Sequence, residues 1–219
     1  MKEFIQVFFK PWGILLLIFI LWLIHFLNVK YSLNLAQFGV YPRTLSGFFG
    51  ILTSPLIHSS DGYNHLLNNS IPLLIMGWAL FYFYQPIGLK IFILSWLITG
   101  LFVWISGRPS HHIGISGVLY SLLFFLFFSG VFRSDGRLLT VALFVVFLYG
   151  SMVWGIFPYD WKISFESHFF GSVTGTVLAI FYRKEGESFK RKKAQWEIEE
   201  ELGIEPPDFE GMFNEENEN

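Results

Sequence analysis

Apolar residues occur along this chain in long runs separated by short polar joints, without the strict alternation typical of a half-buried strand. Each run approaches the roughly 20 residues that a helix needs to cross a bilayer. Only helices or closed barrels satisfy their backbone hydrogen bonds in lipid. The pattern therefore predicts an all-α membrane protein with six transmembrane helices. Their predicted ranges are about 12–29, 65–84, 89–106, 113–132, 138–157 and 163–182.

Most of the joints between these runs are short and polar, such as "YQPIGLK" and "FRSDGR". The connection over 30–64 is the exception, and its many aromatic residues predict a partly ordered segment at the membrane interface. The chain begins with a basic residue and an apolar run, as a signal peptide does, but no small-residue cleavage site follows. We therefore expect the first run to be a retained helix.

Charge is distributed unevenly along the chain. Twelve of the 17 acidic residues lie after residue 184, which separates an almost uncharged membrane body from a polar tail. We expect a cytoplasmic N-terminus over 1–11, a membrane domain over 12–182, and an acidic tail over 183–219. The acidic, Pro-Pro-containing composition of the tail predicts that it is mostly disordered, with a short helix at its start.

Lysine and arginine predict the orientation in the membrane. If both termini are cytoplasmic, the inner segments contain eleven of these residues and the outer segments four. Cytoplasmic segments of membrane proteins carry the excess of positive charge. We therefore expect a multi-pass integral membrane protein with both termini cytoplasmic, in the plasma membrane.

Three of the predicted helices carry polar residues close to the same end. His65 and Asn69 lie four apart on one face of the second helix, Ser116 and Tyr120 lie four apart on the fourth, and His168 begins the sixth. All three helices run in the same direction, so these residues lie at one depth, toward the extracytoplasmic face. Ionisable and amide groups within membrane helices are costly and usually functional. Their convergence favours a site over scattered packing residues.

Small residues accompany these polar groups. Gly171 and Gly175 follow His168 on the same side of the sixth helix, and Gly114 and Gly117 flank Ser116. Small residues four apart allow helix backbones to approach closely in lipid. We expect this spacing to bring the sixth helix against the fourth, as a hydrogen bond between Ser116 and His168 requires.

The sequence contains no motif for a metal, cofactor, nucleotide or nucleic-acid site. The chain has no cysteine and no HExxH motif, and we expect no metal or cofactor. His111 and His112 are adjacent but lie in an outer joint. Nucleotide and nucleic-acid motifs are absent, and the "KRKK" of the tail fits a lipid-surface patch better than a nucleic-acid site. The serine motif lacks the second glycine of a soluble nucleophile elbow, since residue 118 is valine.

In their order and spacing these motifs resemble the rhomboid intramembrane serine proteases. The matching elements are HxxxN at His65–Asn69, GxSG at Gly114–Gly117 with Tyr120 four residues after the serine, and HxxGxxxG at His168–Gly175. The stretch "YPRTLSGFFGILTSPLIH" resembles the membrane-embedded first loop of the family. The resemblance covers roughly 12–182 and implies a six-helix rhomboid-like bundle around a water-filled cavity. It also implies hydrolysis of transmembrane substrates.

The residues themselves predict the same chemistry. Ser116 is the expected nucleophile and His168 the general base. Glu166 is two residues from His168, and residues two apart on a helix do not face each other, so a Ser–His dyad is expected, with Tyr120 packed on the imidazole. We expect the Ser116 N–H, His65 and Asn69 to hold the oxyanion. The spacing of "HSSDGYNH" leaves the role of His58 open.

The expected partners are the lipid bilayer and single-span membrane proteins with small or helix-breaking residues near the outer end of their helix. No nucleic-acid partner is expected, and the oligomeric state is left open. Two other functions stay possible on the sequence alone. One is a rhomboid-like pseudoprotease that binds membrane clients, and the other is a small transporter with His65 and His168 as a proton relay.

Overall fold

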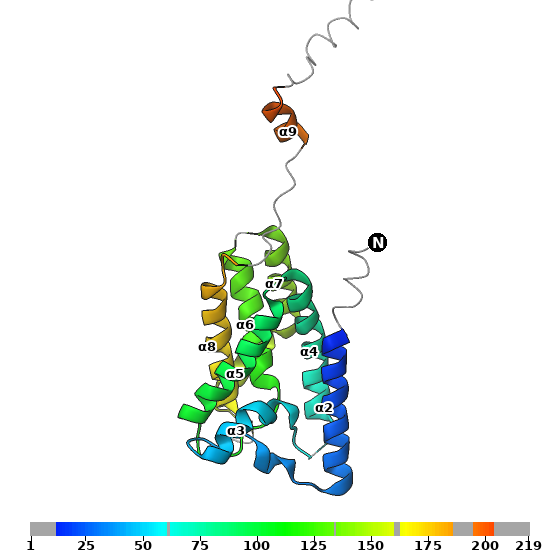
Figure 1. Cartoon of the computed structure of the whole chain (residues 1–219), viewed down its shortest axis with the longest axis vertical. Coiled ribbons are helices and arrows are strands. Elements are labelled where there is room, and N and C mark those ends of the chain that lie inside the picture. Colours follow the sequence, from blue (N-terminus) through cyan, green and yellow to red (C-terminus); the bar gives the residue numbers. More distant parts are fainter. Residues whose placement is uncertain (1–11, 61, 134, 160–162, 186–194, 204–219) are drawn as a thin grey trace, which may run out of the picture. The chain divides into compact units, whose positions relative to one another are not determined.

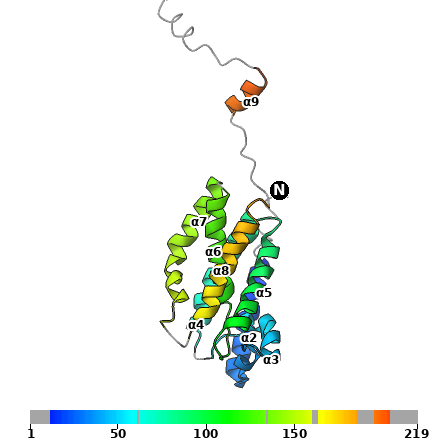
Figure 2. The ribbon, with the colours of Figure 1, turned by 90° about the vertical axis from the view of Figure 1, so that its left-hand side faces the viewer.

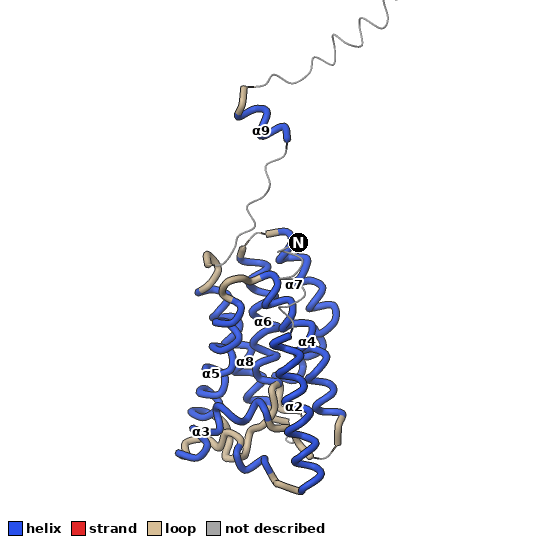
Figure 3. The backbone as a smooth tube through the Cα atoms, turned by 45° about the vertical axis from the view of Figure 1, so that its right-hand side comes forward, coloured by secondary structure: helices blue, strands red, loops and turns tan. Residues whose placement is uncertain are grey.

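A computed structural model of the chain describes residues 12–60, 62–133, 135–159, 163–185 and 195–203. Within these residues the secondary structure is helical, apart from a single bridge between Val40 and His112 (Figure 3). The long helices run along a common direction, side by side (Figure 1). They are α2 (Trp12–Tyr31), α4 (Asn64–Phe83), α5 (Gly88–Ser106), α6 (Ser116–Phe132), α7 (Gly136–Tyr149) and α8 (Phe165–Phe181).

These helices lie where the apolar runs predict them, with boundaries that shift by a few residues. By length and composition, four segments are able to cross a membrane: 12–31, 64–83, 88–106 and 136–156. Helices α6 and α8 have 17 residues each and fall below that length. An integral membrane protein follows from the four long segments, whereas the count of six crossings stays a prediction.

Two boundaries differ from the expected ones for local reasons. The fourth predicted helix begins at Ser116 and not at 113, because Gly114 adopts a positive φ of 102°, which no α-helix contains. The fifth changes character at Gly150, where α7 gives way to a 3-10 segment, η3 (Gly150–Ile156). Both departures lie at the end of the molecule where the polar residues gather.

Helix α6 is the centre of the bundle. Twelve of its 17 residues are buried, and it packs along α8 on one side and contacts α4, α5 and α7 on others. Figure 2 shows α7 beside α6 and on the far side of it from α5. Lipid tails are as apolar as leucine, so close van der Waals packing and interhelical hydrogen bonds hold such a bundle together.

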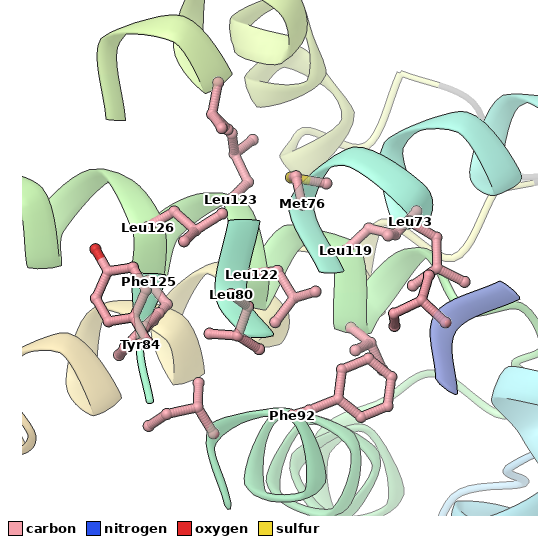
Figure 4. Close-up of a cluster of buried hydrophobic side chains, with 14 of the residues drawn as sticks. Leu73, Met76, Leu80, Tyr84, Phe92, Leu119, Leu122, Leu123, Phe125 and Leu126 are labelled. Atoms are coloured by element: carbon pink, nitrogen blue, oxygen red, sulfur yellow. The ribbon is translucent and has the colours of Figure 1, made fainter. Parts of the chain in front are cut away.

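The apolar core lies between α4, α5 and α6 (Figure 4). Leu73, Met76 and Leu80 of α4 meet the buried leucines of α6 there. At one end the ring of Tyr84 packs edge-on against Phe125, with centroids 5.0 Å apart. A hydroxyl pair adds an interhelical link, because Ser121 Oγ donates to Ser95 Oγ at 2.8 Å. The core thus fixes α6 against its neighbours.

The described residues of the connection between α2 and α4 form short helices, which agrees with the partial order that its aromatic content predicts. It contains η1 (Leu35–Phe38), α3 (Leu45–Thr53) and η2 (Ser54–Leu56). Thr44 caps α3 by accepting from the Gly47 N–H at 3.1 Å. Arg43 donates to the carbonyl oxygens of Ile105 and Gly107, at 3.2 and 3.1 Å, which ties the connection to the end of α5. In Figure 1 α3 lies across one end of the bundle.

Of the expected tail, the structure describes 183–185 and 195–203. A short helix, α9 (Gln195–Glu201), forms where one was predicted. It belongs to a compact unit separate from the helical bundle. The expected N-terminal segment 1–11 and the remainder of the tail lie outside the described residues.

Candidate active site

Ser116 is the first residue of α6, at the end of the bundle that carries α3. The loop over 107–115 leads into it and is held in place from two sides. His112 exchanges both backbone hydrogen bonds with Val40, at 3.0 and 2.8 Å, and the Gly114 N–H donates to the Ser54 carbonyl at 2.9 Å. The left-handed conformation of Gly114 then turns the chain into the helix. Ser116 is buried, with 8% of its surface exposed.

His168 lies on the first turn of α8, and its side chain reaches Ser116. Helix α8 is capped by Ser164, whose side chain accepts from the Ser167 N–H. From this turn His168 Nε2 lies 2.8 Å from Ser116 Oγ, which is hydrogen-bond distance. The two residues are 52 positions apart in the chain, and the structure brings them together as their helix positions predict.

The tautomer of His168 follows from its second contact. Its Nδ1 lies 2.9 Å from the carbonyl oxygen of Gly155, and a carbonyl oxygen only accepts hydrogen bonds. Nδ1 therefore carries the proton, and the Nε2 lone pair is left to accept from Ser116 Oγ–H. This is the form that a general base on serine requires.

The Tyr120 ring stacks on the His168 imidazole, as expected from its position four residues after the serine. The ring centroids are 4.1 Å apart and the planes differ by 10°. The Tyr120 hydroxyl donates to the Met152 carbonyl of η3. The imidazole is thus fixed on its face by Tyr120 and on its edge by Gly155.

The backbone of η3 was not anticipated from the sequence. A Cβ at Gly155 would overlap the Tyr120 hydroxyl and lie 3.1 Å from His168 Nδ1, so only glycine allows this carbonyl to approach the imidazole. A backbone acceptor has no side-chain signature. The one available signal was the glycine itself, within a segment expected to be helical.

Glu166 faces away from His168, as its spacing predicts. Its Oε1 lies 3.4 Å from Arg108 Nε, in a pair at the edge of the site. The Arg108 guanidinium also donates to the Ile163 carbonyl at 2.8 Å. The carboxylate therefore binds the loop after α5 and does not complete a triad.

His65 and Asn69 line the same cavity as the dyad. This cavity has a volume of about 940 Å³ and contains Ser116, Tyr120 and His168 in its wall. The Asn69 side chain is buried, and its Nδ2 has no hydrogen-bond partner among the described residues. A buried donor without a partner costs about 1–3 kcal/mol unless something accepts from it. Asn69 is therefore a cavity-lining residue whose side-chain donor is engaged by no described residue.

His58 packs behind these residues. Its ring meets His65 edge-on at 5.5 Å, and its Nε2 accepts a long hydrogen bond of 3.5 Å from the Ile115 N–H. It is buried and does not line the cavity. Its contacts support the loop before Ser116 and the start of α4.

The glycines predicted to bring two helices together lie at their contact. A Cβ at Gly171 would overlap the Gly117 carbonyl, and one at Gly175 would overlap the Ser121 carbonyl. Gly117 itself faces Thr99 and Ser167. Helices α6 and α8 therefore touch backbone to backbone beside the Ser116–His168 pair. Among the described residues no group of three or more His, Asp or Glu side chains is arranged to hold a metal ion.

Comparison with known proteins agrees with this arrangement. The profile of the rhomboid domain matches residues 46–185. An uncharacterized protein of Mycobacterium tuberculosis is 30% identical over 179 residues, which cover 76% of this chain and 72% of that protein. An uncharacterized protein of Mycobacterium leprae is 28% identical over 182 residues, covering 76% of this chain and 70% of that one. The matched domain contains Ser116, His168 and both residues of the HxxxN motif, and the chain belongs to the rhomboid family.

Proposed function

We propose that this rhomboid-family chain is an intramembrane serine endopeptidase with Ser116 and His168 as its catalytic dyad. The observation that carries the proposal is the 2.8 Å contact between Ser116 Oγ and His168 Nε2. It lies in the wall of a cavity, and the Gly155 carbonyl holds the imidazole in the tautomer that accepts the serine proton. A merely structural serine–histidine pair would have no need of an open cavity or of an uncommitted donor beside it.

In the proposed reaction Ser116 Oγ attacks the scissile carbonyl while His168 Nε2 takes its proton. The imidazolium keeps its Nδ1–H on the Gly155 carbonyl and then protonates the leaving amine at Nε2. Water repeats the sequence on the acyl-enzyme and releases the acid. Ser116 is the first residue of α6, so its N–H has no acceptor within the helix and is free to donate to the oxyanion. Asn69 Nδ2 and His65 are the proposed side-chain donors.

The proposed substrates are single-span membrane proteins. A membrane helix keeps its peptide groups hydrogen-bonded, so a segment must unwind before its carbonyl reaches Ser116. Small or helix-breaking residues near the outer end of the substrate helix lower the cost of that step. We propose lateral access past α7, whose Leu143, Phe144 and Phe147 are exposed and face away from the bundle.

The proposal is tested by covalent labelling. A fluorophosphonate reacts with an activated serine and not with an ordinary hydroxyl, so the folded protein in detergent should be labelled, with the adduct on Ser116 by mass spectrometry. Heat-unfolded protein is the control and should not react. An unlabelled folded protein that still binds membrane clients would favour the pseudoprotease, and labelling elsewhere would exclude the dyad.

Asn69→Ala tests the oxyanion donor. Since this contact strengthens as charge develops, the variant should lose kcat and keep KM. Removal of one oxyanion donor costs about 2.7–4 kcal/mol in a soluble serine protease, or on the order of 10²–10³ in kcat. Asn68→Ala is the matched control, because Asn68 lines the cavity as an exposed neighbour on α4. A change confined to KM would make Asn69 a substrate-binding residue.

The proposed orientation places both termini in the cytoplasm and the dyad near the outer face of the plasma membrane. Lys30, Arg43 and Arg108 lie toward the end with the dyad, whereas Lys90, Arg133 and Arg183 belong to the opposite end. The chain has no cysteine, so single cysteines are clean probes. Ser32→Cys should react with an impermeant maleimide on intact cells, and Asn217→Cys only after lysis. The reverse pattern would place the site at the cytoplasmic face.

A further inference from the structure

His112 lies near the dyad, has both ring nitrogens hydrogen-bonded, and is not used by the proposed mechanism. It precedes Ser116 by four residues in the loop before α6, and only 3% of its surface is exposed. The sequence places it in an outer joint between two predicted helices. Its ring bridges that loop to the first turn of α8, and Ser164 on the far side precedes His168 by four residues.

The hydrogen-bond directions around His112 are determined by its partners. Nε2 lies 3.1 Å from the Arg108 carbonyl, which only accepts, so Nε2 carries the proton. Burial lowers the pKa of His112, which keeps the ring neutral at pH 7. Nδ1 is then an acceptor, and the Ser164 hydroxyl donates a hydrogen bond to it at 2.6 Å.

The chain of hydrogen bonds continues into α8. With its own proton committed to His112, Ser164 Oγ accepts from the Ser167 hydroxyl at 2.7 Å and from the Ser167 N–H at 3.4 Å. Ser164 thus caps α8 and binds the loop before α6 with the same oxygen. Arg108 provides further links between the two segments, because its guanidinium lies 3.4 Å from Glu166 Oε1, donates to the Ile163 carbonyl at 2.8 Å and lies over the Phe165 ring. The His112–Ser164 bond is the one of these links whose α8-side partner is also the N-cap of α8.

We infer that His112, acting through Ser164, is a positioning residue that sets the separation of Ser116 and His168. The inference rests on the proposed function, because it concerns the rate of that reaction. His112 precedes Ser116 by four residues, and Ser164 precedes His168 by four. A change in the His112–Ser164 hydrogen bond therefore moves the start of α6 relative to the start of α8. Tyr120 and Gly155 orient the imidazole, whereas His112 fixes the distance across which the proton moves.

The test compares His112→Phe, Ser164→Ala and the double variant in full-length protein, with active sites counted by end-point fluorophosphonate labelling. A displacement of about 1 Å at reacting groups can cost on the order of 100-fold. Each single variant should lose on the order of 10- to 100-fold in kcat per labelled site, with KM unchanged. The double variant should lose no more than the worse single one, since both break one link. His112→Asn, whose Oδ1 still accepts from Ser164, should recover most of the rate.

Thr53→Val is the matched control, because it removes a loop hydrogen bond to the Phe38 carbonyl without touching α8. Unchanged kcat per labelled site in the variants, or losses that multiply in the double variant, would overturn the positioning role while leaving the dyad intact. If His112→Phe fails to fold, Ser164→Ala and His112→Asn still decide the question. Wild-type protein without Ser116-dependent cleavage would overturn the proposed function, and the positioning role with it.

Discussion

Replacing Ser116 or His168 by alanine is expected to abolish cleavage of a transmembrane substrate. Loss of either dyad residue in a soluble serine protease lowers kcat on the order of 10⁶-fold, and about 10³-fold or more of residual catalysis comes from the oxyanion hole and binding. Here His168 Nε2 is the only base within hydrogen-bond distance of Ser116 Oγ in the described residues. Neither variant retains a group that can replace the missing one.

The measurement is kcat for a model substrate in detergent and in vesicles, together with thermal unfolding. Ser116→Ala should unfold near the wild-type temperature, because it removes a single side-chain hydrogen bond. His168→Ala should unfold at a lower temperature, because it also removes the hydrogen bond to the Gly155 carbonyl and the stack on Tyr120, so its folded state is verified before kcat is compared. The double variant should be no slower than either single one, since the two residues act as a unit. Ser121→Ala is the control on α6, because its hydroxyl faces Ser95 and not the dyad. Substantial cleavage by either dyad variant would refute the assignment.

The sequence predicts the helices of this molecule well, because a run of apolar residues long enough to span lipid has few alternatives to a helix. It also predicts which side chains meet. Ser116 and His168 are each placed at the start of a helix of the same direction, and Gly171 marks the face along which those helices touch. Such inferences need only residue spacing and the size of side chains, and both are visible in the sequence.

The backbone contributions were not predictable in the same way. The Gly155 carbonyl orients His168, yet the sequence signals only a glycine within an apolar run that was expected to continue as helix. The start of α6 depends on the left-handed conformation of Gly114, which depends in turn on the Ser54 carbonyl from a distant loop. The burial of His112 is equally hidden in the sequence, because it depends on contacts with Val40 and Ser164, which are both distant from it in the chain.

Gly171→Ala is expected to lower the rate of cleavage although it adds a single methyl group. The added Cβ would lie less than 3.0 Å from the Gly117 carbonyl oxygen, and both atoms belong to helix positions that side-chain rotation cannot relieve. Helix α8 must therefore move away from α6 at a position three residues from His168. The Ser116–His168 contact lies across that same helix pair.

A shift of about 1 Å at the reacting atoms corresponds to a loss on the order of 100-fold in kcat, and the fluorophosphonate should react more slowly by a similar factor. A Cβ at Gly175 would meet the Ser121 carbonyl about two turns beyond His168. Gly175→Ala should therefore have a smaller effect on rate, because the displacement occurs farther from the dyad. Gly136→Ala is the control, since a Cβ there meets no atom within 4 Å. Normal labelling and cleavage by Gly171→Ala would contradict this account, because the close approach of α6 and α8 would then not hold Ser116 and His168 at 2.8 Å. The hydrogen bond between His112 and Ser164 would have to supply that constraint alone.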